Sequence, residues 1–460
     1  MKKTIHILFI LSLLLPFVSG CGIYTRYQRP ELSVADSLYI RILQNGPDAD
    51  TASLAELSWR ELFTDSLLRQ WIERGIGNNT DLRVAHLRTV EAEAVLQSSR
   101  LAFLPSASFD AQGGISHANG QSAKHTYTVS PTAEWELDIF GRQRNAKEGA
   151  KAALGQSRAY EQAVRTQLVA TVADSYYTLL MLDEQLQISR RTLTTWKENI
   201  RTLSALKRAG KTTEAAVLQA RANKLEVEGS MLTLEKRIGE LENSVCALLG
   251  IAPESLKRGA LSEQCFPDSL SVGLPLSLVS NRPDVQETEY ALMQAFYAAN
   301  EARSAFYPRI TLSGTVGWTN NAGVVANPGT WLFNAVGSLV QPLFHKGENI
   351  ARLKIARARQ EEALLRFRQS LLDAGTEVNN ALIVWQTARD RLEIDRKQIL
   401  NLKAAVWNTK LLMKYGRTHY LEVLTAQHKL LQAELAESED RYDEIQGVIA
   451  LYHALGGGTE

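Results

Sequence analysis

A heptad pattern of apolar and small residues dominates one long stretch of the chain, from about residue 145 to 206. Its positions alternate in steps of three and four, and they are Leu168, Val172, Ser175, Leu179, Leu182, Leu186, Ser189, Leu193, Trp196, Ile200 and Leu203. No proline interrupts the stretch, and a period of 3.5 residues is typical of coiled-coil helices. The pattern predicts one helix of about sixty residues, which spans roughly 90 Å at about 1.5 Å per residue.

A polar turn follows this helix and is expected to reverse the chain. The turn covers residues 208–213 and contains Gly210. The return limb again places apolar residues three and four apart, at Met231, Leu234, Ile238, Leu241, Val245 and Leu248. We expect the limb to end at Gly250, since glycine is common just past the last turn of a helix. The pattern therefore predicts a helical hairpin over residues 141–249.

This hairpin pattern occurs twice. Adding 206 to the first series gives a second one, which is Ala374, Val378, Ala381, Trp385, Ala388, Leu392, Asp395, Ile399, Leu402 and Val406. Two unrelated coiled coils would share a heptad, but they would not place their turn and terminal glycines at the same spacing. Here Gly210 corresponds to Gly416, and Gly250 corresponds to Gly456. We therefore expect a duplicated unit, with its second hairpin over 347–455.

Before each hairpin the period of the pattern changes to two. From 127 to 139, odd positions are apolar or aromatic and even positions are hydroxylic or acidic. Such alternation predicts strands, which we place at about 105–117, 125–140, 308–319 and 331–344. The last strand alternates less cleanly, because Leu332, Val336 and Val340 fall on its polar face. In a soluble sandwich the apolar face would be a core, whereas in an outer-membrane barrel it would face lipid.

A helix is expected before each pair of strands. The first runs from about 65 to 100 with a kink at 78–80, and Pro283 suits the first turn of the second. The predicted organisation is a signal peptide (1–20), an N-terminal tether (21–64), a first repeat (65–250), a linker or equatorial segment (251–280) and a second repeat (281–456).

The N-terminus has the features of a targeting segment. Lys2 and Lys3 precede an apolar core at 5–18, which is shorter than the roughly 20 residues of a membrane-spanning helix. Small residues then lead to Cys21, as at a bacterial lipoprotein cleavage site, where the cysteine would carry an acyl chain such as palmitate. An ordinary signal peptide with an incidental cysteine is the alternative. Gly22 follows instead of aspartate, which favours the outer membrane.

Charge and chemistry-bearing residues narrow the function. The net charge is +1, so nucleic acid is not an implied partner. The sequence holds no phosphate-binding glycine loop, no HExxH and no GxSxG, so we expect neither an enzyme nor a bound cofactor or metal. His419 and His428 are nine residues apart, which does not place them on one helix face. Cys246 and Cys265 flank the linker, and a disulfide or two free thiols both remain open.

Four strands cannot close a barrel, and open sheet edges are not tolerated in lipid. Bacterial barrels have at least about eight strands. If these strands lie in a membrane, the chain must pool them with copies of itself. A barrel continued by helical hairpins would form a conduit, so transport is the expected function.

Several short motifs add a family resemblance. They are Asn-Arg-Pro-Asp-Val at 281–285, Phe-Tyr-Pro at 306–308, Glu-Leu-Asp-Ile-Phe-Gly-Arg at 136–142, and Gly416 with Tyr-Leu-Glu-Val-Leu-Thr-Ala-Gln at 420–427. In this order, the chain after Cys21 resembles the TolC/OprM family of outer-membrane efflux factors. The resemblance implies an α + β membrane protein in which a homotrimer forms a twelve-stranded β-barrel continued by a twelve-helix periplasmic tunnel. It also implies a periplasmic adaptor and, given the lipidated cysteine, an inner-membrane pump of the resistance-nodulation-division (RND) type.

The resemblance further implies a function and a gate. The chain would be an outer-membrane conduit that passes drugs or other small toxic compounds from the periplasm to the exterior of a Gram-negative cell. The hairpin turns at Gly210 and Gly416 would be its free tips. Leu421 and Glu422 would line the closed aperture near the second tip. Thr425 stands where many members carry aspartate, so a second acidic ring is not implied.

Two other functions fit the same patterns. One is the duct of a type I protein-secretion system, whose members usually lack the lipidated cysteine. The other is a lipid-anchored coiled-coil scaffold or adhesin, which would conduct no ions and form no barrel.

Acylation of Cys21 is the prediction that the N-terminus generates. Metabolic labelling with a fatty acid should mark the wild-type protein and leave Cys21→Ala unlabelled. The variant should still fractionate with membranes, because the barrel anchors it independently. Equal labelling of both proteins would contradict the prediction.

Overall fold

The computed structural model describes residues 25–30, 57–117, 123–264, 266, 282–320, 329–344, 346–415, 417–418 and 420–457. The described residues form two compact units. One contains the strands, with most of 88–158 and 287–368, and the other contains most of 159–286 and 369–457. Each unit therefore draws on both sequence repeats. Cys21, Cys265, Gly416 and His419 lie outside the described residues.

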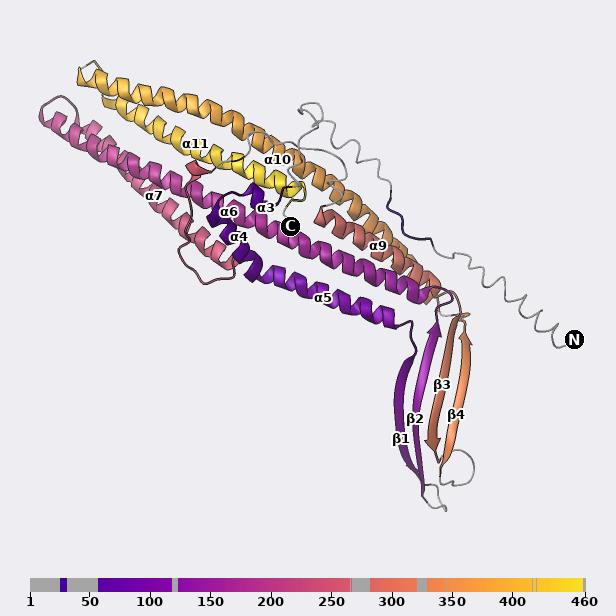
Figure 1. Ribbon diagram of the computed structural model, residues 1–460. Coiled ribbons are helices and arrows are strands. Elements are labelled where there is room, and N and C mark those ends of the chain that lie inside the picture. Colours follow the sequence, from indigo (N-terminus) through magenta and orange to yellow (C-terminus); the bar gives the residue numbers. More distant parts are fainter. Residues whose placement is uncertain are drawn as a thin grey trace. The chain divides into compact units, whose positions relative to one another are not determined.

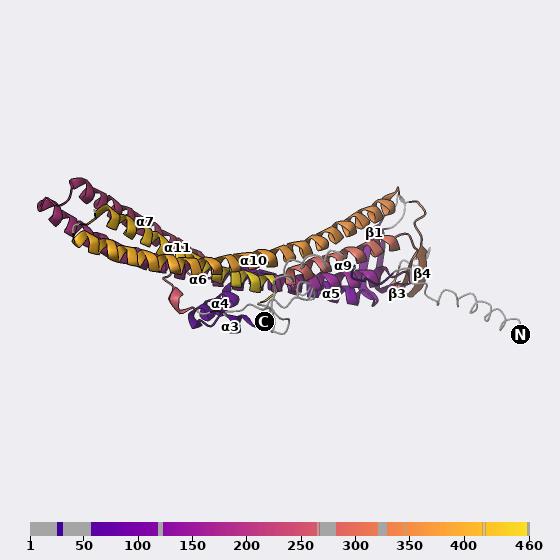
Figure 2. The same cartoon turned by 90° about the horizontal axis from the view of Figure 1, so that it is seen from above.

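The two repeats give helices of equal length. The pairs are α5 (Thr80–Leu101) and α9 (Pro283–Ser304) with 22 residues, α6 (Arg142–Arg208) and α10 (Glu348–Lys414) with 67, and α7 (Glu214–Leu248) and α11 (Tyr420–Ala454) with 35. Figures 1 and 2 show α7 beside α6 and α11 beside α10, as expected of two hairpins. Both hairpins end at a glycine with positive φ, Gly250 at 65° and Gly456 at 84°.

Two short helices precede α5 in the chain. They are α3 (Trp59–Leu62) and α4 (Ser66–Asn78), and a one-turn 3-10 helix, η2 (Leu261–Glu263), lies in the linker. The expected kink near 78–80 is a break at Asn79, between α4 and α5. The predicted tether thus ends in a helix, because the Trp59 and Leu62 side chains are buried.

The strands are β1 (Ser106–Ser116), β2 (Lys124–Leu137), β3 (Arg309–Thr319) and β4 (Thr330–Val340). Two of them end earlier than the sequence suggested. After β2, the Asp138 carboxylate accepts hydrogen bonds from the backbone N–H groups of Gln143 and Arg144, both at 2.9 Å. Asp138 therefore caps α6 and cannot continue the strand. After β4, Pro342 lacks the N–H that a continued ladder would need.

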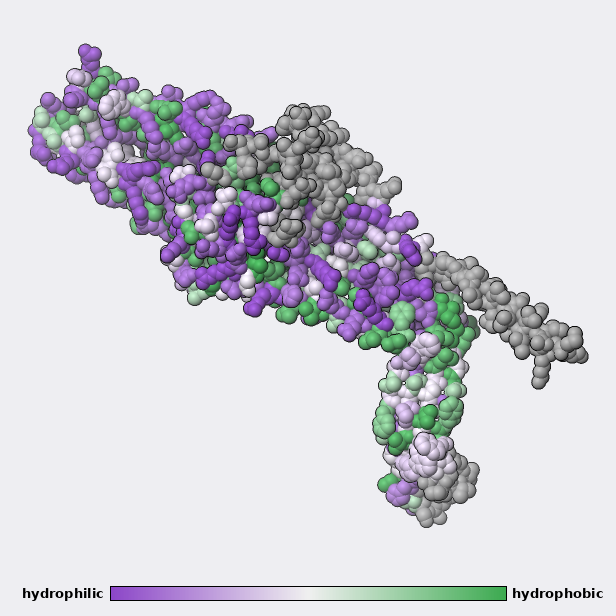
Figure 3. Space-filling model, in the orientation of Figure 1, coloured by the Kyte–Doolittle hydropathy of each residue, from purple (hydrophilic) through white to green (hydrophobic). Residues whose placement is uncertain are grey.

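All four strands pair antiparallel in the order β1-β2-β3-β4. The register puts like with like, since Trp135 lies opposite Leu312 and Thr132 lies opposite Thr315. One face is therefore apolar and the other is hydroxylic and acidic. Among the described residues, none covers the apolar face, and Phe333 is 78% exposed. Figure 3 shows hydrophobic colour over the strands, in contrast to the mainly hydrophilic hairpins.

The heptad seam becomes the core of the second unit. Leu168, Val172 and Leu179 of α6 are at most 5% exposed. They belong to one buried cluster with Val378 of α10 and Val448 of α11. This confirms the helical period that the sequence predicted, and it explains why the polar residues between seam positions are mostly exposed.

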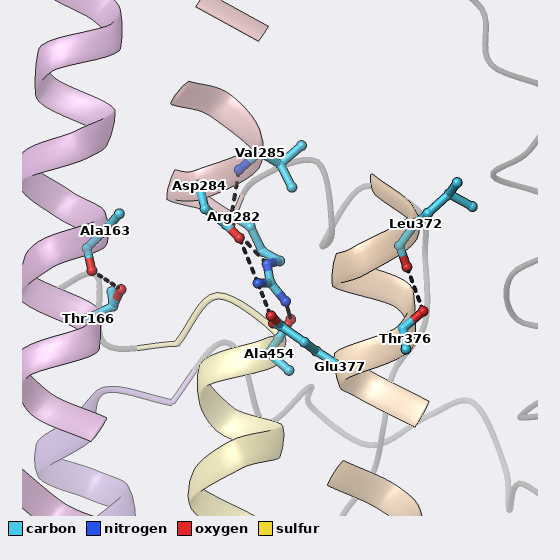
Figure 4. A network of polar contacts seen from close by, with 9 residues as sticks. All are labelled: Ala163, Thr166, Arg282, Asp284, Val285, Leu372, Thr376, Glu377 and Ala454. Atoms are coloured by element: carbon cyan, nitrogen blue, oxygen red, sulfur yellow. Dashed lines mark hydrogen bonds and ion pairs between the residues drawn. The ribbon is translucent and has the colours of Figure 1, made fainter. Parts of the chain in front are cut away.

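One contact ties each repeat's first helix to the end of its last helix. In the first repeat the Asn79 amide donates to the Leu248 carbonyl at 3.0 Å. In the second repeat the Arg282 guanidinium donates to the Ala454 carbonyl at 2.8 Å (Figure 4). These pairs occupy equivalent positions, so the duplicated contact is kept although the residue types differ. Each side chain satisfies a carbonyl at a helix end that has no partner within the helix.

Of these two contacts, the one made by Arg282, called the Arg282 clamp below, involves more charged groups. Its side chain is 3% exposed and pairs with Asp284 at 2.8 Å and Glu377 of α10 at 2.6 Å (Figure 4). Burial alone would raise the pKa of Asp284, but the hydrogen bond and charge of Arg282 outweigh it and lower that pKa. Arg282 therefore joins α9, α10 and α11 at one point.

Removing the clamp should loosen this junction. Arg282→Met removes the guanidinium donor from the Ala454 carbonyl and from the Asp284 and Glu377 carboxylates. The cost should be about 2 kcal/mol because both carboxylates are half exposed. Asn79→Ala removes a single neutral hydrogen bond and should cost about 1 kcal/mol. Hydrogen exchange in the last turns of α11 and α7 measures both. Arg366→Met, at an exposed pair within α10, is the control, and an equal effect there would contradict the assignment.

Candidate gate at the hairpin tips

The two hairpin turns share one backbone hydrogen bond. At the first tip Gly210 has φ +67°, and the Lys211 N–H donates to the Leu206 carbonyl at 2.9 Å. At the second tip the Arg417 N–H donates to the Leu412 carbonyl, also at 2.9 Å and 206 residues later. This six-to-one hydrogen bond is typical of helices that end with a left-handed residue. It explains why glycine stands at position 210.

The predicted gate residues lie together at the start of α11. Leu421, Glu422 and Thr425 are all exposed, and Leu421 retains 63% of its accessible surface. Leu421 and Thr425 are four residues apart and share one helix face. The Thr425 hydroxyl donates to the Leu421 carbonyl at 2.9 Å, so it is bonded within its own helix. Within one chain these side chains border solvent, and only neighbouring copies could bring them to a common axis.

Glu422 has a structural reason to stand where it does. It lies in the first turn of α11, where the helix dipole stabilises a carboxylate. Among the described residues no ion pair joins Glu422 to Arg417 or to another cation. The carboxylate is therefore available to attract cations from solution.

A buried hydrophobic cluster lies next to the exposed residues at the start of α11. It joins α6, α7 and α11 through Ile188, Trp196, Leu203, Val217, Ala220, Val227, Tyr420, Leu424 and Leu431. Burial raises the pKa of the Tyr420 hydroxyl well above its usual range, so it stays neutral. The residues next to the candidate gate residues are thus fixed on a packed surface, which sets the direction of the exposed side chains.

One buried polar pair at the tip could not be found from the sequence. The side-chain amide of Asn199 on α6 donates to Oε1 of Gln427 on α11 at 2.6 Å, and both residues are at most 7% exposed. Polar pairs inside an apolar interface fix its register, because a slipped arrangement would leave them unpaired. Both residues look like ordinary polar helix positions in the sequence, and 228 residues separate them.

Among the described residues, one cysteine, Cys246, and the arrangement of possible metal ligands can be assessed. Cys246 is buried outside any disulfide, and its thiol lies 3.4–3.5 Å from the backbone N and O of Glu254. In the part of the chain that the structure describes, no three His, Cys, Asp or Glu residues are arranged to hold a metal ion. None of the described helices combines the length and apolarity of a membrane span.

The chain is similar along almost its whole length to proteins of known role. It is 30% identical over 461 residues to the cation efflux system protein CusC of Escherichia coli, covering 97% of this chain and 99% of that one. It is 28% identical to the probable outer membrane lipoprotein SilC of Salmonella typhimurium (96% of both chains) and 27% identical to the toluene efflux pump outer membrane protein TtgC of Pseudomonas putida (96% and 93%).

Solved structures agree with the sequence comparison. The outer-membrane channel OprN superposes with a TM-score of 0.85 at 26% identity, covering 95% of this chain and all of that one. The open state of the MtrE outer membrane channel of Neisseria gonorrhoeae gives 0.85 at 28% identity, with 96% and 99% covered. The strand and helix order described above is therefore the fold of outer-membrane channels.

A family model described as outer membrane efflux protein matches residues 71–251 and 274–457, which overlap the two sequence repeats at 65–250 and 281–456. The duplicated hairpins, the four-stranded sheet with its uncovered apolar face and these similarities lead to one conclusion: the chain belongs to the outer membrane efflux protein family.

Proposed function

We propose that three copies of the chain form a passive duct through the outer membrane, which a periplasmic adaptor and an inner-membrane pump of the RND type supply with small toxic compounds. The observation that carries the proposal is the sheet. Its apolar face is uncovered, and β1 and β4 each have a partner on one side only within the described chain. Three four-stranded sheets would close a twelve-stranded barrel by pairing β4 of one copy with β1 of the next, which leaves no edge in lipid.

The helices support the same assembly through the internal repeat. Three leucines of α7, seven residues apart, form an exposed stripe: Leu218, Leu225 and Leu232, at 53%, 63% and 69%. Their equivalents in α11, 206 residues later, are Leu424, Leu431 and Ser438, and all three are buried. The positions that are buried on α11 are thus exposed at the equivalent places on α7. This is expected if a neighbouring copy covers the α7 stripe.

The complementary surface lies on α10. Ile383 and Ile394 are 58% and 63% exposed, whereas their equivalents in α6, Tyr177 and Ile188, are at most 3% exposed. Ile188 packs in the same cluster as Leu424 and Leu431. A second copy would therefore place its α10 against α7 in the way that α6 packs against α11. Repeating this contact around a threefold axis gives a closed ring of helices.

The proposed cargo is small toxic compounds in general, selected by the pump. The polar face of the sheet carries hydroxyls such as Thr128 and Thr319, whose oxygens are 2.8 Å apart, and carboxylates such as Glu136. Such a wall is suited to passing hydrated solutes. The relatives are named for cations, toluene, solvents and antibiotics, so one fold serves several cargoes. A protein-secretion duct is the second candidate in the same class, and those names favour efflux. The lipoprotein name of SilC supports acylation at Cys21.

A pair of substitutions in β2 tests the duct directly. Trp135→Asp puts a charge on the face assigned to lipid. Such a charge costs up to about 2–4 kcal/mol for Arg or Lys at mid-bilayer and less for Asp, so heat-modifiable barrel migration and single-channel conductance should be reduced. Thr132→Asp places the same charge on the polar face and should keep both. Export should be followed in cells that lack their own outer-membrane duct. Equal effects at the two positions would mean that the faces are assigned wrongly, and a wild type without conductance would favour the scaffold.

Substitution of Glu422 tests the gate. Three Glu422 carboxylates around a narrow axis should attract cations and bind divalent ions that block the channel. Glu422→Ala should reduce divalent-cation block in planar bilayers and lower cation selectivity, and Glu437→Ala, farther along α11, should change neither. If Glu422→Ala leaves both unchanged, the aperture is formed by other residues, and the first turn at 211–216 becomes the candidate.

A further inference from the structure

The heptad seam of α10 contains one charged residue, Asp395, and it meets another carboxyl group. Asp395 is 8% exposed and Asp440 of α11 is 1% exposed. The two carboxyl groups are within hydrogen-bonding reach of each other. The Oδ2 atoms of both are buried and have no hydrogen-bond donor when both groups are ionised. A proton on one carboxyl group would supply such a donor.

The surrounding charges do not neutralise the pair. On α10, Arg391 forms an ion pair with Asp440, with 3.0 Å between its Nε and Oδ1 of Asp440, but its side chain is 58% exposed. On α11, Asp443 adds a further negative charge, and its own pKa is raised by burial and by Glu439. One arginine thus faces three carboxyl groups.

Groups on neighbouring elements are engaged elsewhere. Asp174 of α6 accepts hydrogen bonds from Tyr442 and Gln446. Arg441 donates to the backbone of Gln264 in the linker and pairs with Glu444 at 3.7 Å. Toward the tip, Lys403 of α10 pairs with Glu434 of α11 at 3.4 Å. Among the described residues, none of these cations pairs with Asp440, so a proton is the group best suited to hold the two carboxyls together.

The pair lies where α10 and α11 are already in close contact. Gly447, two turns along α11, has the backbone of Trp385 within 2.9 Å of where a Cβ would stand. Helices this close leave little room for two repelling charges to separate without opening the interface. The equivalent positions in the first hairpin are Ser189 and Leu234, so only the second hairpin carries the pair.

We infer that Asp440 and Asp395 form a proton-dependent lock between α10 and α11: the protonated Asp440 carboxyl donates to the Asp395 carboxylate and holds the second hairpin closed, and loss of that proton leaves two like charges that loosen it. The step is a simple proton exchange with water. The lock acts on the hairpin that carries Leu421, Glu422 and Thr425 at its tip. Its effect on a gate rests on the proposed function, whereas the lock itself does not.

The direction of the pH dependence follows from the proton count. Burial, then the contact with Asp395, raises the pKa of Asp440 to about 7, well above its value in an open chain. The closed hairpin therefore binds a proton that the open one releases, and its stability falls as pH rises through about 7. Between pH 6 and pH 8 a pKa near 7 gives about a tenfold increase in the opening equilibrium constant.

Hydrogen exchange of the full-length protein in detergent, corrected for the intrinsic pH dependence of exchange, tests the lock. In the wild type, amides at 388–399 of α10 and 433–446 of α11 should open about tenfold more readily at pH 8 than at pH 6. Asp440→Asn supplies a permanent donor and should remove this dependence. Asp395→Ser introduces the residue type that the first hairpin has at the equivalent position, Ser189, and should remove the dependence as well. If one of the two variants fails to fold, the other still tests the inference. Asp390→Asn, at an exposed position of α10, should keep it.

An infrared spectrum gives an independent readout. A protonated carboxylic acid band should be present in the wild type at pH 6 and missing in Asp440→Asn. Wild-type exchange without pH dependence, or the same dependence in Asp440→Asn, would overturn the inference. Bilayer conductance forms a separate arm. If exchange follows the prediction and conductance does not change with pH, the lock stands and its link to the gate is wrong.

Discussion

Unpaired strand edges are the constraint on which the rest of this structure depends. The chain folds four antiparallel strands into one sheet, and the apolar side of that sheet is uncovered. In lipid the backbone groups of β1 and β4 have no water to bond with, so they must find other strands. Copies of the same chain are the available source. The hairpins also need neighbouring copies, because the leucine stripe of α7 is exposed among the described residues of one chain.

The internal duplication explains how one sequence can meet this requirement at every level. Equivalent helices have equal lengths, and equivalent contacts persist although the residues differ. Asn79 and Arg282 both bind the carbonyl at the end of a return helix. The indole of Trp135 likewise donates to the Phe103 carbonyl before β1. At the equivalent place in the second repeat, the side-chain amide of Gln341 donates to the Phe306 carbonyl before β3. Because the two repeats pack alike, an interface seen within the chain predicts the interface between chains.

Sequence periodicity was sufficient for the elements and insufficient for their partners. The heptads, the turn glycines and the strand alternation place every long helix and all four strands, because each depends on local spacing. The end of β2 was missed, since Asp138 reads as a strand residue until its bonds to the start of α6 are known. Pairings across the chain, such as Asn199 with Gln427 and Asp395 with Asp440, depend on which helices meet and in which register. The tip residues Leu421, Glu422 and Thr425 are exposed at the start of α11. Their predicted meeting at an axis depends on the assembly and stays a prediction.

Crosslinking at the predicted contact between copies tests the trimer most directly. Within the chain Asn199 meets Gln427, and the equivalent positions are Ala405 on α10 and Arg221 on α7. A protein with both Ala405→Cys and Arg221→Cys, treated with a short thiol-to-thiol crosslinker in membranes, should run as a covalent trimer on a denaturing gel. Each single variant should stay a monomer. A double variant that yields no crosslinked species, or one that forms ladders beyond three, would contradict the closed ring of three chains.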